Sequence, residues 1–282
     1  MKNLITRTAT GILFVAIMTG AFFANRIVLL ILFFVLCMVG TWEYIRVLKK
    51  NEHDLSPTFT LLLSGMFFLL VGMFSIYSEC GQITETISII LLGSWGLTLM
   101  VLPVAEMFRD KNKPVENIAL TLLPLFWIAL PFSLSCAWAG AWGKNNLLLA
   151  LLFLLWLNDT LAYGAGSLWG KHRLFERVSP KKSWEGFVIG LVLTVAAAPW
   201  IGKLPCFENT GFSTTWQWWG FAATVVITGT FGDLVESMFK RSYNVKDSGR
   251  LLPGHGGVLD RFDSFLFAAP AGFIYHFLII VS

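Results

Sequence analysis

The chain has 282 residues, of which 56% are hydrophobic and only 13% are charged, and its formal net charge is +4. Soluble globular chains carry about 25% charged residues, so this composition excludes an ordinary water-soluble protein. It also excludes a nucleic-acid-binding surface, because no basic stretch is free of acidic residues or of apolar runs.

Apolar runs of roughly 20 residues recur along the chain, and each is long enough to cross a hydrocarbon core of about 30 Å. We expect helices, because lipid offers the backbone no hydrogen-bond partners, and the runs are continuous rather than alternating. The sequence predicts an all-α polytopic membrane protein. Its transmembrane helices, about nine, are expected near residues 8–25, 27–47, 58–78, 85–107, 117–140, 146–168, 185–202, 215–235 and 262–281.

The ends of the chain and its basic residues predict the orientation. The first run lacks a good signal-peptidase site, so we expect it to be retained as a span. With a cytoplasmic N-terminus, all but three of the 21 basic residues fall in cytoplasmic segments, as the positive-inside rule requires. The three residues left outside are Arg26, Lys144 and Lys203.

The two halves of the chain differ in polarity. Residues 1–140 contain short charged connections between apolar runs, which predicts membrane helices for packing and anchoring. Residues 141–282 contain two polar clusters and are expected to hold the functional site. No repeat or soluble segment separates the halves, so we predict one integrated domain.

The first polar cluster covers residues 156–190. Asp159 lies within an apolar run, where an ionisable group costs at least ~3 kcal/mol unless it is paired or hydrated. Asp159 is therefore a candidate site residue, and a buried structural ion pair is the alternative. Lys181 and Lys182 are expected to open the next helix, whose N-terminal end attracts anions. A positive-inside anchor would explain one or two lysines equally well.

The second polar cluster covers residues 231–264. Asp233, Ser237 and Lys240 are spaced i, i+4, i+7, so on a helix they share one face. A carboxylate, a hydroxyl and an ammonium on one stripe can hold a metal and a phosphate together. The alternative is a surface ion pair between Glu236 and Lys240, with Asp233 as a bystander.

Two more carboxylates follow at the start of the last apolar run. Asp260 and Asp263 are spaced i, i+3 and again share a helical face. Such a pair suits Mg²⁺, which binds a few carboxylates together with water and substrate phosphates. Taken alone, the pair could equally be a charged first helical turn.

A glycine-rich loop, "PGHGG", lies between the helical face that carries Asp233 and the one that carries Asp260 and Asp263. Gly254, Gly256 and Gly257 permit backbone conformations in which N–H groups form an anion-binding concavity. His255 either contacts a phosphate or binds a loop carbonyl. The two clusters together predict a cytoplasmic-side pocket for a polyphosphate, Mg²⁺ and a lipid. No GxxxxGK[ST] or GxGxxG motif occurs, which excludes a P-loop or Rossmann nucleotide site.

Two stretches resemble a known family. "SMFKRSYNVKDSGRLLPGHGGVLDRFD" (237–263) and "NDTLAYGAGSLWGKHRLFERVSPKKSWEG" (158–186) are similar to the signature blocks of the phosphatidate cytidylyltransferases, or CDP-diacylglycerol synthases. The chain departs from the family at Arg173, where lysine is frequent, and at Glu176, where proline is common. The N-terminal half resembles the family only as a series of membrane spans.

The resemblance implies a reaction and a set of site residues. CTP and phosphatidic acid would give CDP-diacylglycerol and pyrophosphate, with Mg²⁺ and a monovalent cation such as K⁺, in a bacterial cytoplasmic (inner) membrane. It further implies a homodimer. The implied catalytic residues are Asp233, Ser237, Lys240, Asp260 and Asp263, with the metal on Asp233, Asp260 and Asp263. The implied phosphate contacts are Lys181, Lys182, Arg241, Lys246, Asp247, Arg250, Gly254, His255, Gly256 and Gly257.

Two other functions remain open at this point. A CTP-dependent polyprenol or lipid-alcohol kinase would share the nucleotide and the membrane setting but release CDP. A membrane transporter would also contain buried charges, although its polar groups are expected near mid-membrane in matching halves.

Overall fold

The structure is a computed structural model and describes residues 2–73, 77–141, 145–207, 210–249 and 256–281. Within these ranges the regular secondary structure is helical except for one antiparallel hairpin of two strands, and short turns and loops connect the elements. The α-helices are α1 (Lys2–Phe23), α2 (Arg26–Lys50), α3 (Pro57–Gly72), α4 (Tyr77–Phe108), α5 (Pro114–Pro124), α6 (Leu130–Ala141), α7 (Asn145–Trp169), α8 (Trp184–Ile201), α9 (Thr215–Ser242) and α10 (Leu259–Val281). The strands are β1 (Arg173–Phe175) and β2 (Ser179–Ser183).

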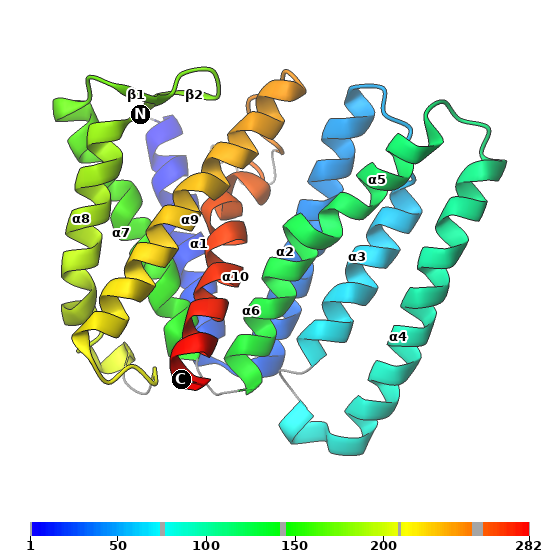
Figure 1. Cartoon of the computed structure of the whole chain (residues 1–282), viewed down its shortest axis with the longest axis horizontal. Helices are drawn as coiled ribbons and strands as arrows, with labels where there is room; N and C mark the ends of the chain where they lie inside the picture. Colours follow the sequence, from blue (N-terminus) through cyan, green and yellow to red (C-terminus); the bar gives the residue numbers. More distant parts are fainter. Residues whose placement is uncertain (1, 74–76, 142–144, 208–209, 250–255, 282) are drawn as a thin grey trace. The chain divides into compact units, whose positions relative to one another are not determined.

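Each apolar run predicted from the sequence overlaps a helical stretch of the described chain (Figure 1). Six of these stretches are long and apolar enough to cross a membrane: Arg26–Lys50, Glu85–Phe108, Pro114–Ala139, Asn146–Trp169, Trp184–Ile201 and Leu259–Ile279. Helix α3 is a shorter apolar helix, as is the Phe14–Phe23 part of α1. An all-α polytopic membrane protein is therefore confirmed, and six of the nine predicted spans meet the criterion in the described residues.

The chain divides into two compact units. The first comprises residues 1–143 and 245–261, and the second comprises residues 144–244 and 262–282. The segment after α9 thus belongs to the first unit, although the sequence around it belongs to the second. Helix α10 begins in the first unit and continues in the second.

In the first unit, α2, α3 and α6 pack side by side (Figure 1). Buried leucines of α3, α4 and the π-helical turn Leu125–Ala129 form an apolar cluster, in which Leu63, Leu102 and Leu125 are almost fully buried. At one end of this unit the α2–α3 and α4–α5 connections meet. The Arg109 guanidinium there donates to the Asp54 carbonyl over 2.7 Å.

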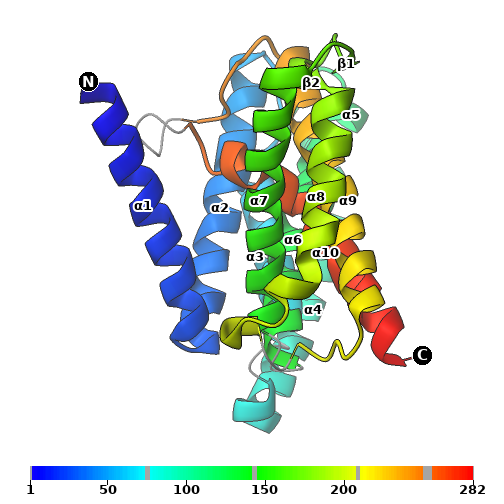
Figure 2. The same cartoon turned by 90° about the vertical axis from the view of Figure 1, so that its left-hand side faces the viewer.

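In the second unit, α7 and α8 pack closely along their length (Figure 2). Small residues make this approach possible, because a β-carbon at Gly186 would lie 2.7 Å from the Ala162 carbonyl oxygen. A β-carbon at Gly190 would lie 2.9 Å from the β-carbon of Ala162. Helix α9 packs against both α7 and α8.

The β1–β2 hairpin connects α7 to α8 and was not predicted from the sequence. Lys181 and Lys182 lie in β2, so the expectation that they open the next helix is wrong. Helix α8 begins at Trp184, and the Ser183 hydroxyl caps it by accepting the Gly186 N–H over 3.2 Å. The lysines therefore stand on an extended strand just before the helix, and the cap serine ends that strand.

Candidate active site

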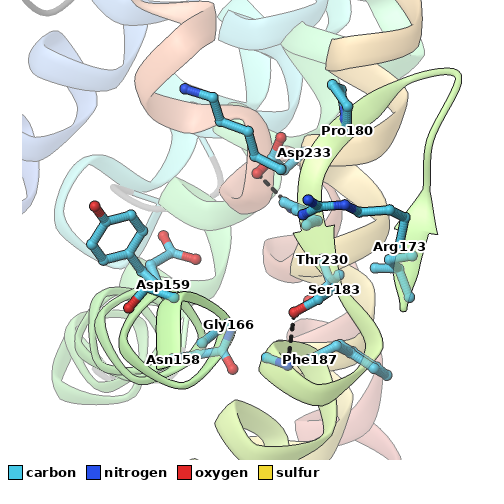
Figure 3. A pocket seen from close by; sticks show the side chains of 16 residues that line it. Asn158, Asp159, Gly166, Arg173, Pro180, Ser183, Phe187, Thr230 and Asp233 are labelled. Atoms are coloured by element: carbon cyan, nitrogen blue, oxygen red, sulfur yellow. Dashed lines mark hydrogen bonds and ion pairs between the residues drawn. The ribbon is translucent and has the colours of Figure 1, made fainter. Parts of the chain in front are cut away.

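A cavity of about 490 Å³ lies in the second unit, between α7, the hairpin, α8 and α9. Asp159 of α7 and Asp233 of α9 extend towards it, and Arg173 of the hairpin stands beside it (Figure 3). Apolar side chains such as Phe187 complete the wall. The cavity therefore combines charged groups with the apolar surfaces of helices.

An ion pair connects the hairpin to α9 at this cavity. The Lys182 ammonium lies 2.6 Å from the Oδ2 atom of Asp233 (Figure 3). The Oδ1 atom of Asp233 accepts a hydrogen bond from the Ser237 hydroxyl over 3.3 Å, as their i, i+4 spacing predicts. Both carboxylate oxygens of Asp233 are thus oriented by neighbours within the second unit.

Two further carboxylates stand within electrostatic reach of this pair. Asp263, at the start of α10, interacts with Asp233, Asp159 and Lys182. Asp159 in turn interacts with Lys182 and Asp233. Three carboxylates of the second unit therefore interact with one another and with Lys182, and a bound cation would offset their mutual repulsion. The structure thus joins Asp159, from the first polar cluster, to Asp233 and Asp263 from the second.

The hairpin adds positive charge at the cavity. Lys181 and Arg173 line it together with Lys182. The hairpin is anchored at its start by Glu185 of α8, whose carboxylate accepts the N–H groups of Lys171 and His172 at 3.1 and 3.2 Å. The base of the strand pair is thereby fixed to the N-terminal turn of α8.

The end of α9 carries two of the predicted basic residues. Lys240 forms an ion pair with Glu236, one turn earlier on the same helix. An ion pair between Glu236 and Lys240 is the alternative that the sequence predicts for this helix, but at the surface. In the structure the Glu236 side chain is buried. Arg241 donates through Nε to the Val178 carbonyl over 3.5 Å and so reaches the hairpin. A phosphate contact for either residue stays a prediction.

Asp260 lies in the first turn of α10 and, by its contacts, belongs to the first unit. Its Oδ2 atom accepts the N–H groups of Ser248 and Gly257 at 2.9 and 2.8 Å, and the Ser248 hydroxyl at 3.0 Å. Gly256 has a positive φ of 83°, which only glycine adopts readily. The Gly257 N–H that was predicted to cradle a phosphate therefore meets a carboxylate of the chain itself.

Sequence reasoning missed Glu43, a buried carboxylate of α2. Its side chain accepts the N–H groups of Val258 and Leu259, each at 3.0 Å, and the Ser248 hydroxyl at 3.1 Å. The signal was present, because Glu43 lies inside a predicted span, as Asp159 does. Its partners lie more than 200 residues later in the sequence, which no local pattern reveals.

Several predicted site residues cannot be compared with this geometry. Arg250, Gly254 and His255 lie outside the described residues. Lys246 and Asp247 are exposed on the segment that follows α9 in the first unit. Phosphate binding by these five residues stays a prediction.

The carboxylates at the cavity suit a divalent cation by their chemistry. Mg²⁺ needs only one or two protein carboxylates when water and substrate phosphates supply its other ligands. In the part of the chain that the structure describes, no three His, Cys, Asp or Glu side chains form a ready-made metal cage. The donor set of Asp159, Asp233 and Asp263 fits a metal that shares its coordination with phosphate oxygens.

Comparison with known proteins places this geometry in a family. A profile of the cytidylyltransferase family matches residues 5–279. A phosphatidate cytidylyltransferase of Haemophilus influenzae is 32% identical over 256 residues, which cover 86% of this chain and 88% of that protein. One of Staphylococcus epidermidis is 30% identical over 266 residues, 94% of this chain and 95% of the relative.

The similarity is highest over a shorter stretch. A phosphatidate cytidylyltransferase of Staphylococcus saprophyticus is 47% identical over 130 residues, 45% of this chain and 47% of that protein. The family profile nevertheless extends through the N-terminal half, which the two sequence blocks did not indicate. The chain belongs to the cytidylyltransferase family.

Proposed function

We propose that this chain transfers the CMP moiety of CTP to phosphatidic acid and so forms CDP-diacylglycerol and pyrophosphate for phospholipid biosynthesis. The observation that carries the proposal is the cavity at which Lys182 pairs with Asp233 beside Asp159 and Asp263. Together with membership of the cytidylyltransferase family, it supports phosphoryl chemistry at a membrane.

The proposed reaction is a displacement at phosphorus. An oxygen of the lipid phosphate attacks the α-phosphorus of CTP, the bond from that phosphorus to the β-phosphate oxygen breaks, and pyrophosphate leaves with the electron pair. The attacking phosphate is already an anion at neutral pH, so the site needs no strong base and no covalent intermediate. The protein must instead position the two phosphates and neutralise their charge.

We assign this charge neutralisation to the bases at the cavity. Lys182 is held by Asp233, which fixes its position at the junction of hairpin and α9. Lys181 and Arg173 line the same cavity and can contact phosphate oxygens. Ser237 orients the Asp233 carboxylate through its hydroxyl. Lys240 and Arg241, at the end of α9, are proposed to contact the leaving pyrophosphate.

Mg²⁺ is the cofactor that we propose for these carboxylates. Asp233, Asp260 and Asp263 are the ligands that we propose, as the sequence predicts, and Asp159 interacts with Asp233 and Asp263 within the second unit. When bound, Mg²⁺ polarises phosphoryl oxygens and offsets the charge that develops on the leaving group. The three hydrogen bonds that Asp260 accepts are typical of a carboxylate kept in a ligating orientation. A monovalent cation such as K⁺ suits the same hard oxygen donors.

We also propose nine spans, with the N-terminus and the cavity on the cytoplasmic side of the inner membrane. Segments predicted to be cytoplasmic lie together in each unit, which supports this orientation. In the first unit Arg109 of the α4–α5 connection binds the Asp54 carbonyl. In the second unit Arg241, which follows the span predicted over 215–235, donates to the Val178 carbonyl of the hairpin connection. A single cysteine at Arg177, exposed on the hairpin, should react with an impermeant reagent only after the membrane is opened, whereas one at Lys203 should react directly.

The products distinguish this function from its rivals. We expect label from the α-phosphate of CTP to appear in the lipid, and label from the γ-phosphate to appear in pyrophosphate, when purified protein is given phosphatidic acid and Mg²⁺. A lipid-alcohol kinase would instead place the γ-label in the lipid and release CDP. A transporter would form neither product. Chemical cross-linking of the same preparation tests the homodimer that we propose for the enzyme.

A further inference from the structure

Glu43 lies in the half of the chain that the sequence assigned to packing. It stands on α2, and only 3% of its surface is exposed. A carboxylate this deeply buried is costly unless hydrogen bonds satisfy it. In the described chain its hydrogen-bond partners are Ser248 and Val258, on the segment between α9 and α10, and Leu259, the first residue of α10. All of these residues lie within the first unit.

The contacts of Glu43 fix the backbone at the start of α10. Its Oε1 atom accepts the Val258 N–H and its Oε2 atom accepts the Leu259 N–H. Leu259 is the first residue of α10. The first N–H groups of a helix have no partner within that helix, and an anion placed there is favoured by the helix dipole. Glu43 supplies this anion from a helix 216 residues away in sequence.

Two glycines make room for the carboxylate. A β-carbon at Gly249 would collide with the Glu43 Oε1 atom, and one at Gly257 would collide with both carboxylate oxygens. At Gly249 and Gly257 the backbone therefore lies directly against Glu43, and larger residues at these two positions would force the backbone and the carboxylate apart.

Ser248 connects Glu43 to a proposed metal ligand. Its hydroxyl lies 3.1 Å from Oε2 of Glu43 and 3.0 Å from Oδ2 of Asp260. Asp260 also accepts the Gly257 N–H, which immediately precedes the two N–H groups bound by Glu43. Glu43 and Asp260 thus hold successive N–H groups of one short segment, and a shift of that segment would move Asp260.

We propose that Glu43 is a positioning residue for the transfer reaction: from α2 it fixes the residues that lead into α10 and thereby the orientation of Asp260. The proposal rests on the function proposed above. Glu43 itself touches neither substrate nor reacting atoms. Partners that orient ligating carboxylates typically change metal affinity or activity by about 10- to 100-fold when they are removed.

The first test is structural and needs no substrate. In the Glu43→Gln variant of the full chain, volume and shape are kept, but the charge is lost and one acceptor becomes a donor that faces an N–H group. We expect hydrogen–deuterium exchange of the peptide containing Val258 and Leu259 to accelerate about 10-fold, as befits the loss of a hydrogen bond to a charged group. Glu43→Asp, which keeps the charge, should restore part of the protection.

The second test is kinetic. For folded Glu43→Gln we expect kcat for CDP-diacylglycerol formation to fall about 10- to 100-fold and the Mg²⁺ concentration for half-maximal rate to rise. The KM for CTP should change less than kcat, because Glu43 does not contact the nucleotide. A residue that serves only packing would lower the amount of folded enzyme and leave the Mg²⁺ dependence unchanged.

Glu106 offers a matched control. It is likewise a carboxylate of the first unit with 3% of its surface exposed, but it binds Arg109 and Asn117 at 2.6 and 2.8 Å rather than the segment before α10. Glu106→Gln should lower stability while leaving both the exchange of that segment and the Mg²⁺ dependence unchanged. If Glu43→Gln does not fold, Ser248→Ala takes its place, with the same direction of change and a smaller size.

Some results would overturn the proposal. The proposal is contradicted if folded Glu43→Gln has wild-type kcat and Mg²⁺ dependence, even if its hydrogen–deuterium exchange accelerates. It is also contradicted if exchange is unchanged in both Glu43→Gln and Ser248→Ala. A wild-type protein that forms no CDP-diacylglycerol would instead contradict the proposed function, and the exchange experiment would still report whether Glu43 holds the segment.

Discussion

Carboxylates in the two units of the molecule have different surroundings. In the first unit, Glu43 and Glu106 are buried and each accepts several hydrogen bonds or an ion pair from the chain. In the second unit, Asp159, Asp233 and Lys182 line a cavity, and Asp263 interacts electrostatically with all three. The first arrangement is satisfied by hydrogen bonds and an ion pair within the protein, whereas the second places three interacting carboxylates and several bases at or near a cavity that substrate phosphates and a cation can share.

This difference shows how a carboxylate that stabilises the fold of a membrane protein can be distinguished from one that takes part in catalysis. Burial of an acidic residue within a span does not identify a catalytic residue, since Glu43 and Asp159 both lie in spans. What distinguishes them is whether neighbouring donors balance the charge and whether the group faces a cavity. The following predictions test this distinction, starting from the largest expected effect.

Replacing Asp233 should have the largest effect on activity. Asp233→Asn removes the partner of Lys182 and a proposed metal ligand at once. We expect kcat/KM for CDP-diacylglycerol formation to fall about 10³-fold, the size typical of losing a main electrostatic contribution to the transition state. The measurement is a steady-state assay in detergent micelles that contain phosphatidic acid. Glu176→Gln, an exposed acid of the hairpin, is the control and should retain wild-type activity.

Replacing Lys182 should have a smaller but distinct effect. Lys182→Met keeps the length of the side chain but removes the charge that we assign to phosphate binding. We expect a loss of about 10²-fold in kcat/KM, with a higher KM for CTP, whereas Lys182→Arg should retain part of the activity. Lys171→Met, on an exposed residue at the start of the hairpin connection, provides the comparison. Equal losses of kcat/KM in Lys182→Met and Lys171→Met would mean that activity depends on the total positive charge of the hairpin region rather than on the ion pair between Lys182 and Asp233.

The close contact of α7 and α8 predicts an effect on stability. Gly186→Ala places a β-carbon 2.7 Å from the Ala162 carbonyl oxygen and should destabilise the fold by about 1–3 kcal/mol. Gly164→Ala, on α7, meets nothing within 4 Å and should be neutral or slightly stabilising, because alanine is the better helix former. Thermal unfolding in the same detergent measures both. A similar melting temperature for the two variants would contradict the packing described for the cavity wall.

The helices and their approximate limits could be predicted from the sequence. Continuous apolar runs predict membrane helices because lipid leaves the backbone no other partner, and each predicted run overlaps a helix. The i, i+4 spacing of Asp233 and Ser237 likewise predicted that they share a helical face, and their hydrogen bond is consistent with it. Such local patterns depend on residues less than two turns apart.

Features that depend on distant residues could not be predicted in this way. The hairpin has two short strands rich in charge, and Glu185 and its contacts with Lys171 and His172 anchor it. The partners of Glu43 lie on a segment that the chain reaches only after seven further α-helices, α3 to α9, of the described structure. Which acidic residues gather around Lys182 is likewise set by the packing of α7, α9 and α10, and the sequence alone did not distinguish Asp159 from a structural ion pair.

One pair of variants tests the central distinction most directly. Asp263→Asn, in the second unit, and Glu106→Gln, in the first unit, each replace one carboxylate by its amide. The measurement is kcat for CDP-diacylglycerol formation per folded molecule. We predict a loss of at least about 10²-fold for Asp263→Asn and a rate within about twofold of wild type for Glu106→Gln, which should lose stability instead. Wild-type turnover in Asp263→Asn, or an equal loss in both variants, would contradict the account.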